Sequence, residues 1–162
     1  MQKKNKYFDN IPGWQKGFIA IAGAAAAGYI FIKLTKKVEE KKQLIGATNE
    51  LNAINQELEN IQQPASFSQA QYNSWANSLF ISMDGWGSDE NSIYNIFKLL
   101  KNNADLLQLI KAFGIREISS GSFNPEPNVK GTLIQCLTSE LSANEINNIN
   151  SILSKSGITF KF

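Results

Sequence analysis

The longest apolar run of the chain lies near its N-terminus. Residues 17–32 (GFIAIAGAAAAGYIFI) contain no charged residue and lie between Lys16 and Lys33. A helix of this length spans about 24 Å, against a bilayer hydrocarbon core of about 30 Å. Lys16 and Lys33 can extend their ammonium groups toward water, and Trp14 and Tyr29 suit the headgroup level. The pattern therefore predicts a transmembrane helix at residues 14–34, after an N-terminal arm at residues 1–13.

This run is short, and two other interpretations stay open. Its six strongly apolar residues favour insertion by only about 2–4 kcal/mol in total. A secretory signal peptide would also have basic residues before the run and a cleavage site among small residues, such as those within Ala24–Gly28. A buried core helix fits less well, because a helix that is apolar on all sides needs a larger protein around it. Lysines lie on both sides of the run, so the orientation in the membrane stays open.

Residues 35–63 have a heptad pattern. Leucine recurs every seven residues, and alanine or isoleucine follows each leucine by three (Leu44, Ala47, Leu51, Ile54, Leu58 and Ile61). In parallel coiled coils, Leu at a with Ile at d favours trimers or tetramers. The pattern covers fewer than three heptads, so it fits equally well a helix that packs on the chain's own globular domain. We expect a helical stalk, and both homo-oligomer formation through this seam and intrachain packing are retained.

Residues 64–162 have helical periodicity, and turn signals divide them into five helices. The apolar positions predict the helices at or near Tyr72–Met83, Ile93–Leu100, Leu106–Phe113, Val129–Glu140 and from Ser142 to Gly157. Residues 119–128 are predicted to form a polar surface loop. Residues 158–162 alternate like a short strand or a docking tail.

Capping signals support these boundaries. Ser88 is predicted to begin the second helix, because its hydroxyl can accept from a backbone N–H of the first turn. Gly114 is predicted to end the third. Ser142 and Glu145 have the spacing of a capping box at the start of the fifth. Together the patterns predict a mainly α protein with a transmembrane helix, a helical stalk and a five-helix bundle.

Composition matters mainly through what the sequence lacks. There is no histidine, so nucleophile–histidine pairs and histidine metal ligands are excluded. Cys136 is the single cysteine, which excludes an internal disulfide and multi-cysteine zinc sites. It lies on an apolar helix stripe and is predicted to be a buried structural thiol. A net charge of +2 with one arginine, Arg116, argues against a nucleic-acid partner. We expect a protein without catalytic machinery and without a cofactor.

The segment Met83–Glu90 (MDGWGSDE) between the first two helices, with Ser139–Ser142 (SELS) between the last two, resembles an annexin repeat over residues 68–155. In that family the carbonyls of a Gly-x-Gly loop and a later acidic side chain bind Ca²⁺ against lipid phosphate. The resemblance implies a calcium site made by the carbonyls of Met83, Gly85 and Gly87 with the carboxylate of Glu145.

The sequence also departs from the annexin pattern. There is one repeat instead of four, and residues 119–128 lengthen the separation between Gly87 and Glu145 beyond the family's usual spacing. Glu145 also has a structural explanation as a capping residue. A Ca²⁺-dependent lipid-binding module that bridges membranes is therefore retained as the alternative function.

A short membrane segment followed by a single-repeat domain is similar to small proteins of Bacteroidota and of the phages that infect them. The residues that carry this second resemblance are Ala112–Arg116 (AFGIR), Glu140–Ser142 (ELS) and Gly157–Phe160 (GITF). It implies an accessory or virion-type protein. We expect a non-enzymatic, membrane-anchored structural or adaptor protein, located in the internal membrane of a phage particle or otherwise in a bacterial cell membrane. Its expected partners are the lipid bilayer and a structural protein such as a capsid component.

Overall fold

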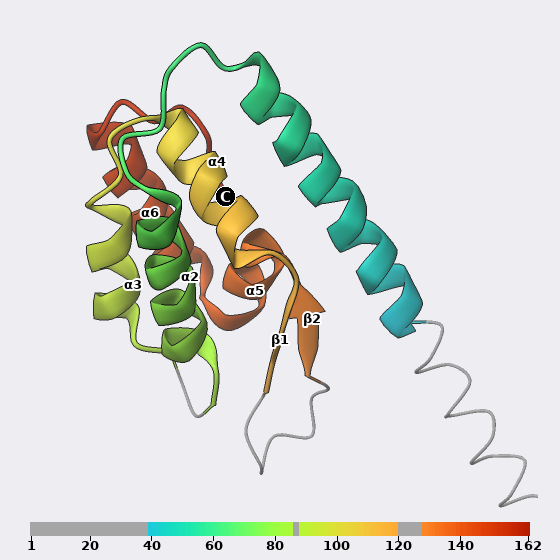
Figure 1. Cartoon of the computed structure of the whole chain (residues 1–162). Coiled ribbons are helices and arrows are strands. Elements are labelled where there is room, and N and C mark those ends of the chain that lie inside the picture. Colours follow the sequence, from blue (N-terminus) through green and yellow to red (C-terminus); the bar gives the residue numbers. More distant parts are fainter. Residues whose placement is uncertain (1–38, 86–87, 120–127) are drawn as a thin grey trace, which may run out of the picture. The chain divides into compact units, whose positions relative to one another are not determined.

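The computed structural model describes residues 39–85, 88–119 and 128–162, and these residues are mainly α-helical (Figure 1). A helix covers residues 39–60. The later elements are α2 (Gln69–Met83), α3 (Glu90–Phe97), α4 (Asn103–Phe113), β1 (Arg116–Ile118), β2 (Val129–Gly131), α5 (Leu133–Glu140) and α6 (Ala143–Lys155). Residues Lys42–Phe162 form one compact unit. The expected mainly α class is confirmed for the part of the chain that the structure describes.

Each helix from α2 to α6 begins after a polar residue whose side chain suits the helix N-terminus. The caps are Ser68, Asp89, Asn102, Thr132 and Ser142. Such residues satisfy backbone N–H groups that have no partner inside the first turn. Gly114 ends α4 with φ of +64°, as predicted. The boundaries are therefore determined largely by local side chains.

Two predicted helix starts were wrong, and in both cases a stronger cap lies further along the chain. The cap of α3 is Asp89, whose carboxylate accepts from the Ser92 backbone N–H (3.1 Å) and hydroxyl (2.6 Å). The hydroxyl oxygen of Ser88 is buried without a hydrogen-bond partner among the described residues. The fourth predicted helix begins at Leu133 and not near Val129, because Thr132 and Gln135 form a capping box.

Residues 129–131 are a strand instead of a helical turn. β2 pairs antiparallel with β1 in the register Arg116–Gly131, Glu117–Lys130 and Ile118–Val129. Gly131 suits this position, because a Cβ there would lie 2.5 Å from the side-chain oxygen of Gln135. Three-residue strands are too short to show an alternating pattern, so the sequence did not predict this hairpin.

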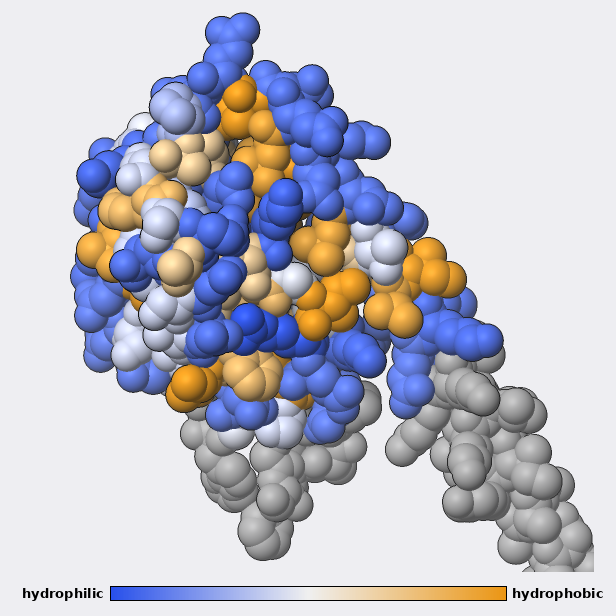
Figure 2. Space-filling model, in the orientation of Figure 1, coloured by the Kyte–Doolittle hydropathy of each residue, from blue (hydrophilic) through white to orange (hydrophobic). Residues whose placement is uncertain are grey.

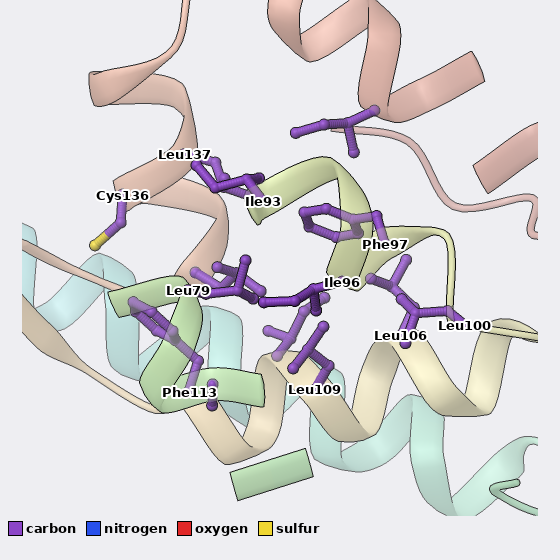
Figure 3. Close-up of a cluster of buried hydrophobic side chains, with 14 of the residues drawn as sticks. Leu79, Ile93, Ile96, Phe97, Leu100, Leu106, Leu109, Phe113, Cys136 and Leu137 are labelled. Atoms are coloured by element: carbon purple, nitrogen blue, oxygen red, sulfur yellow. The ribbon is translucent and has the colours of Figure 1, made fainter. Parts of the chain in front are cut away.

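A single apolar core joins the helices (Figure 3). Leu79 of α2, Ile93 and Phe97 of α3, and Leu109 of α4 are fully enclosed within it. Burying a side chain of this size contributes about 1.5–3 kcal/mol relative to leaving it exposed. The core therefore accounts for most of the stability of the bundle.

The chain end after α6 packs back onto the bundle. Gly157 has φ of +72°, and the Ile158 N–H donates to the Leu153 carbonyl (3.0 Å), which is the pattern of a Schellman motif. Asn103 of α4 accepts from the Thr159 N–H (2.9 Å). Asn150 of α6 accepts from the Phe162 N–H (2.9 Å) and donates to its carbonyl (3.1 Å). The docking-tail interpretation of residues 158–162 is therefore confirmed.

The helix of residues 39–60 packs on the bundle of its own chain. Ile54 belongs to the core, and Leu51, Leu58 and Ile61 pack against it. The Thr132 hydroxyl donates to the carboxylate of Glu50. The C-terminal part of the predicted stalk is therefore a structural part of the folded unit, in agreement with the intrachain interpretation of the heptad pattern.

A buried carboxylate connects three segments of the unit. Asp105, in the first turn of α4, is fully buried. It accepts from the Ser66 N–H (2.6 Å), the Tyr72 hydroxyl (2.7 Å) and the Lys101 N–H (2.9 Å). Burial alone would raise the pKa of the Asp105 carboxyl, but these hydrogen bonds outweigh burial and hold this pKa below its ordinary value. The same environment, burial first and then the Asp105 contact, raises the pKa of Tyr72.

The Asp105 network leads to a prediction about stability and pH. Asp105→Asn should lower the free energy of unfolding at pH 7 by about 2–4 kcal/mol, because the amide places N–H donors against donors. The folded pKa of Asp105 lies below the unfolded value of about 3.9. Its contribution is therefore complete above about pH 4 and is lost as pH falls through the folded pKa.

Urea denaturation at pH 7 and at acidic pH measures this effect. The variant should be less sensitive to acid than the wild type. Asp89→Asn is the matched control, since asparagine remains a good cap and should change stability by less than about 0.5 kcal/mol. Equal losses in the two variants would contradict a special role for Asp105.

The docked helix leads to a second prediction. Ile54→Ala should lower the free energy of unfolding by about 2–4 kcal/mol, whereas Ile45→Ala on the exposed side of the same helix should change it by less than about 0.5 kcal/mol. The loss should be independent of protein concentration. A loss that grows on dilution would show instead that Ile54 contacts a second copy.

Candidate functional site

The loop between α2 and α3 is the candidate calcium site, and its first residues are tied to the end of β1. Met83 is the last residue of α2 and is fully buried. The carboxylate of Asp84 accepts from the Ser119 N–H (2.9 Å) and hydroxyl (2.6 Å). The Gly85 N–H donates to the Ser119 carbonyl (3.3 Å). These bonds lower the pKa of Asp84 and hold the loop against the hairpin.

Gly85 has a conformation that favours glycine. Its φ is +116°, in a region that L side chains rarely adopt. At the other end of the loop, the Asp89 N–H donates to the Ser82 carbonyl (2.9 Å). The glycine therefore lets the chain reverse direction between α2 and α3, which explains its presence without a ligand.

The structure places the expected calcium ligands in two different local settings. Met83 and Gly85 lie in the α2–α3 segment, whereas Gly87 lies outside the described residues. Glu145 lies in the first turn of α6, where its carboxylate accepts from the N–H and the hydroxyl of Ser142, both at 2.7 Å. These bonds lower the pKa of Glu145. The predicted capping box is confirmed, and the acid that lies in the α2–α3 loop is Asp84, whose carboxylate is bonded to Ser119.

Within the described ranges, no group of three or more acidic or thiol side chains is arranged to hold a metal ion. This finding concerns side chains only, whereas three of the four expected calcium ligands are backbone carbonyls. The calcium hypothesis for Met83, Gly85, Gly87 and Glu145 therefore stays a prediction.

The other chemically distinctive side chains have structural partners. Cys136 is buried, and its thiol donates to the Gly131 carbonyl (Sγ–O 3.6 Å). Burial is the main cause that raises the pKa of Cys136 to about 12, so at neutral pH it is a protonated, unreactive thiol. This confirms the predicted structural thiol. The guanidinium of Arg116 lies over the rings of Phe80 (5.3 Å) and Phe113 (5.0 Å), and its Nε donates to the Phe113 carbonyl (2.9 Å).

Sequence reasoning missed two of these local arrangements. The capping box of Thr132 and Gln135 has the T-x-x-Q spacing and was visible in the sequence. The contact between Asp84 and Ser119 joins residues 35 positions apart and left no local signal.

The predicted membrane segment, residues 14–34 with Trp14, Lys16, Tyr29 and Lys33, lies outside the described residues, as does the arm at residues 1–13. Of the helices in the described ranges, none has the length and hydropathy needed to span a bilayer. Four large apolar side chains in these ranges are strongly exposed: Leu44, Ile45, Ile81 and Leu99.

Comparison with known proteins adds no relative. No protein-family model, no curated protein and no solved structure matches this chain.

The calcium and structural roles of Glu145 can be separated by two substitutions. Glu145→Gln keeps a side chain that can accept from the Ser142 N–H but removes the negative charge that Ca²⁺ needs. Ser142→Ala removes the reciprocal cap and should cost about 0.5–2 kcal/mol. If Glu145 acts only as a cap, Glu145→Gln should leave the melting temperature nearly unchanged with or without calcium. Ser142→Ala should then lower the melting temperature by the same amount in the presence and in the absence of calcium. A calcium-induced rise in wild-type melting temperature that Glu145→Gln abolishes would instead favour the annexin-like site.

Proposed function

We propose that this protein is a non-enzymatic, membrane-anchored adaptor whose helical unit binds a structural protein. Residues 14–34 hold it in a bilayer, and residues Lys42–Phe162 present a rigid binding body. In the setting that the sequence resemblance implies, the bilayer is the internal membrane of a phage particle and the partner is a capsid component. The same arrangement would serve in a bacterial cell membrane.

The observation that carries this proposal is the docking of the helix that follows the apolar segment. Ile54 is part of the core, and Glu50 accepts a hydrogen bond from Thr132. The chain therefore enters the folded unit as a packed helix and not as a Gly- or Ser-rich linker. From Lys42 onward this helix and the bundle form one compact unit, which suits a tether.

The use of the polar side chains supports a non-enzymatic role. Asp105 and Tyr72 form a buried structural pair, Asp89 and Glu145 cap helices, and Cys136 is a protonated core thiol. A catalytic acid, base or nucleophile needs access to substrate and a pKa suited to its task. These five groups are instead committed to the fold.

The exposed side of α2 supports a protein partner. The helix (QAQYNSWANSLFISM) contains no charged residue, and Ile81 near its end is 72% exposed. Protein interfaces are depleted of charged residues at their centre, because charges are costly to remove from water. An uncharged helix surface with an exposed isoleucine is therefore the part of the unit that we assign to the partner.

The anchor can be tested by a single charge. A lysine at the centre of a transmembrane helix costs about 2.5–3.5 kcal/mol, which is close to the total insertion free energy of residues 17–32. Ala25→Lys should therefore move the full-length protein from the membrane pellet to the soluble fraction after carbonate extraction. Asn49→Lys, on an exposed position of the docked helix, is the control and should stay in the pellet. Wild-type protein in the supernatant would refute the anchor.

A further inference from the structure

Two apolar surfaces of the folded unit differ in whether a described segment covers them. Leu44 and Ile45 are exposed near the beginning of the helix of residues 39–60, where Figure 2 shows apolar surface. Residues 158–162, which we call the tail, run back from the end of α6 and cover a second surface (Figure 1). This second surface therefore shows the chemistry of what it binds. The side chains that hold the tail, which we call the tail site, are Phe97 of α3, Asn103 of α4 and Asn150 of α6.

Asn150 binds the main chain of the tail. Its side-chain oxygen accepts from the Phe162 N–H (2.9 Å), and its side-chain nitrogen donates to the Phe162 carbonyl (3.1 Å). Opposite residues of neighbouring antiparallel strands exchange the same pair of hydrogen bonds. Asn150 therefore holds Phe162 as a neighbouring strand would, through atoms that every residue of an extended chain except proline provides.

Asn103 makes a similar contact nearer the beginning of the tail. Its side-chain oxygen accepts from the Thr159 N–H (2.9 Å), and its side-chain nitrogen donates to the Thr159 hydroxyl (3.1 Å). An amide side chain can make such a pair because it carries both donors and an acceptor. The two asparagines hold the tail at positions three residues apart, so the tail site recognises an extended segment.

The aromatic side chains of the tail add selectivity. Phe160 and Phe162 are partly buried and pack against the core. The Phe162 ring lies edge-on to the rings of Phe97 and Phe160, each with a centroid distance of 5.5 Å. Aromatic pairs in this geometry contribute more than the area they bury. Thr159 and Lys161 are exposed instead, so the site selects aromatic side chains at alternate positions.

After Ile158 the tail is held like a bound peptide and not like an element of the core. Ile158 is buried, and its N–H completes the turn at Gly157. None of the four residues that follow is fully enclosed. Segments with few buried side chains open at a lower free-energy cost than the core. These four residues can therefore leave the site while the bundle stays folded.

We infer that the tail site is a peptide-binding site for the structural protein partner, and that the tail occupies it as an internal competitor. The ligand is an extended segment with aromatic side chains two residues apart, because that is what residues 160–162 present to the site. This inference rests on the proposed function. It adds a contact of defined sequence to the uncharged surface of α2.

A second copy of the chain fits the tail site less well than a partner does. The tail belongs to the same chain as the site, so its effective concentration there is about millimolar. A second copy could offer its own tail only by releasing it from its own site. A partner's segment has no such competitor at its origin, and it displaces the tail when it binds more tightly than the tail does.

The test uses the full chain in detergent micelles, with a fluorescent peptide of the sequence of residues 157–162 (GITFKF) as the probe. Phe160→Ala with Phe162→Ala removes both rings from the protein's own tail and leaves the tail site unchanged. The peptide should bind this variant about tenfold more tightly than it binds the wild type, because the wild-type tail competes. Fluorescence anisotropy measures both dissociation constants, and circular dichroism checks the fold. Equal affinity for the two proteins, or no binding to the folded variant at about 1 mM peptide, would overturn the inference.

Two matched pairs test the main-chain contact. Asn150→Ala, added to the tail variant, should weaken peptide binding about tenfold, whereas Asn147→Ala at an exposed position of the same helix should not change it. A methyl group on the peptide nitrogen of Phe162 removes the donor to Asn150 and should weaken binding about fivefold. The nitrogen of Lys161 has no hydrogen bond among the described residues, so methylation there is the control. Equal losses from the two methylated peptides would contradict the strand-like contact.

A spin label at Lys161→Cys tests displacement in a protein that keeps both aromatic side chains of its tail. Lys161 is exposed, and Cys136 stays unlabelled because it is buried and its thiol is protonated. Millimolar peptide should increase the mobility of the label, whereas a peptide with both phenylalanines replaced by alanine should not. Unchanged mobility would show that the tail stays in place and would overturn the inference. So would a mobility that follows the protein concentration, because that result identifies a second copy as the occupant.

Carbonate extraction separates this inference from the anchor. Protein that stays in the membrane pellet but binds no peptide refutes the tail site and leaves the anchor intact. Protein that carbonate releases, yet that binds the peptide in micelles through Asn150, refutes the anchor and supports the tail site.

Discussion

The fold depends on a buried negative charge that has to be satisfied. The carboxylate of Asp105 would be costly inside an apolar core without partners. Its three donors come from the segment before α2, from α2 itself and from the turn before α4. Asn102 reinforces the same junction, because its side chain caps α4 and donates to the Pro64 carbonyl (3.3 Å). Removing any of these segments leaves polar groups buried and unpaired, so the core can close only when all of them are in place.

This requirement also explains how the helix of residues 39–60 is connected to the bundle. The connection at residues 61–68 is not free to move, since Ser66 binds Asp105 and Ile61 packs on the core. Further back, Ile54 enters the core and Glu50 binds Thr132 at the start of α5. The helix is thus held at several points along its length. From Lys42 onward the helix and the bundle therefore form one compact unit, which supports the proposed role as a tether.

The polar side chains of the described residues mainly cap helices and hold neighbouring segments together. Asp84 links the α2–α3 loop to the hairpin through Ser119, and Glu145 closes the capping box of α6. Both side chains are acids in a region where the annexin resemblance implies calcium, and both already accept two hydrogen bonds. In each case one carboxylate oxygen accepts both bonds, so these bonds orient the carboxylate for the fold and leave its second oxygen without a hydrogen bond among the described residues. What the unit has left for recognition is its surface, which includes the uncharged side of α2 and the exposed side chains of Leu44 and Ile45.

The sequence by itself determined the helical class, the five helices of the bundle and several of their ends, because these depend on periodicity and on caps such as Ser142–Glu145 and Gly114 that act over three or four residues. It also determined the burial of Cys136, which follows from an apolar stripe. Only the tertiary structure showed that Leu51 and Ile54 pack within their own chain, since a coiled coil would bury the same stripe. The hairpin, the Asp84–Ser119 contact and the role of Asp105 were likewise decided there. Each joins residues far apart in the chain, and the pattern around any one of them does not identify its partner.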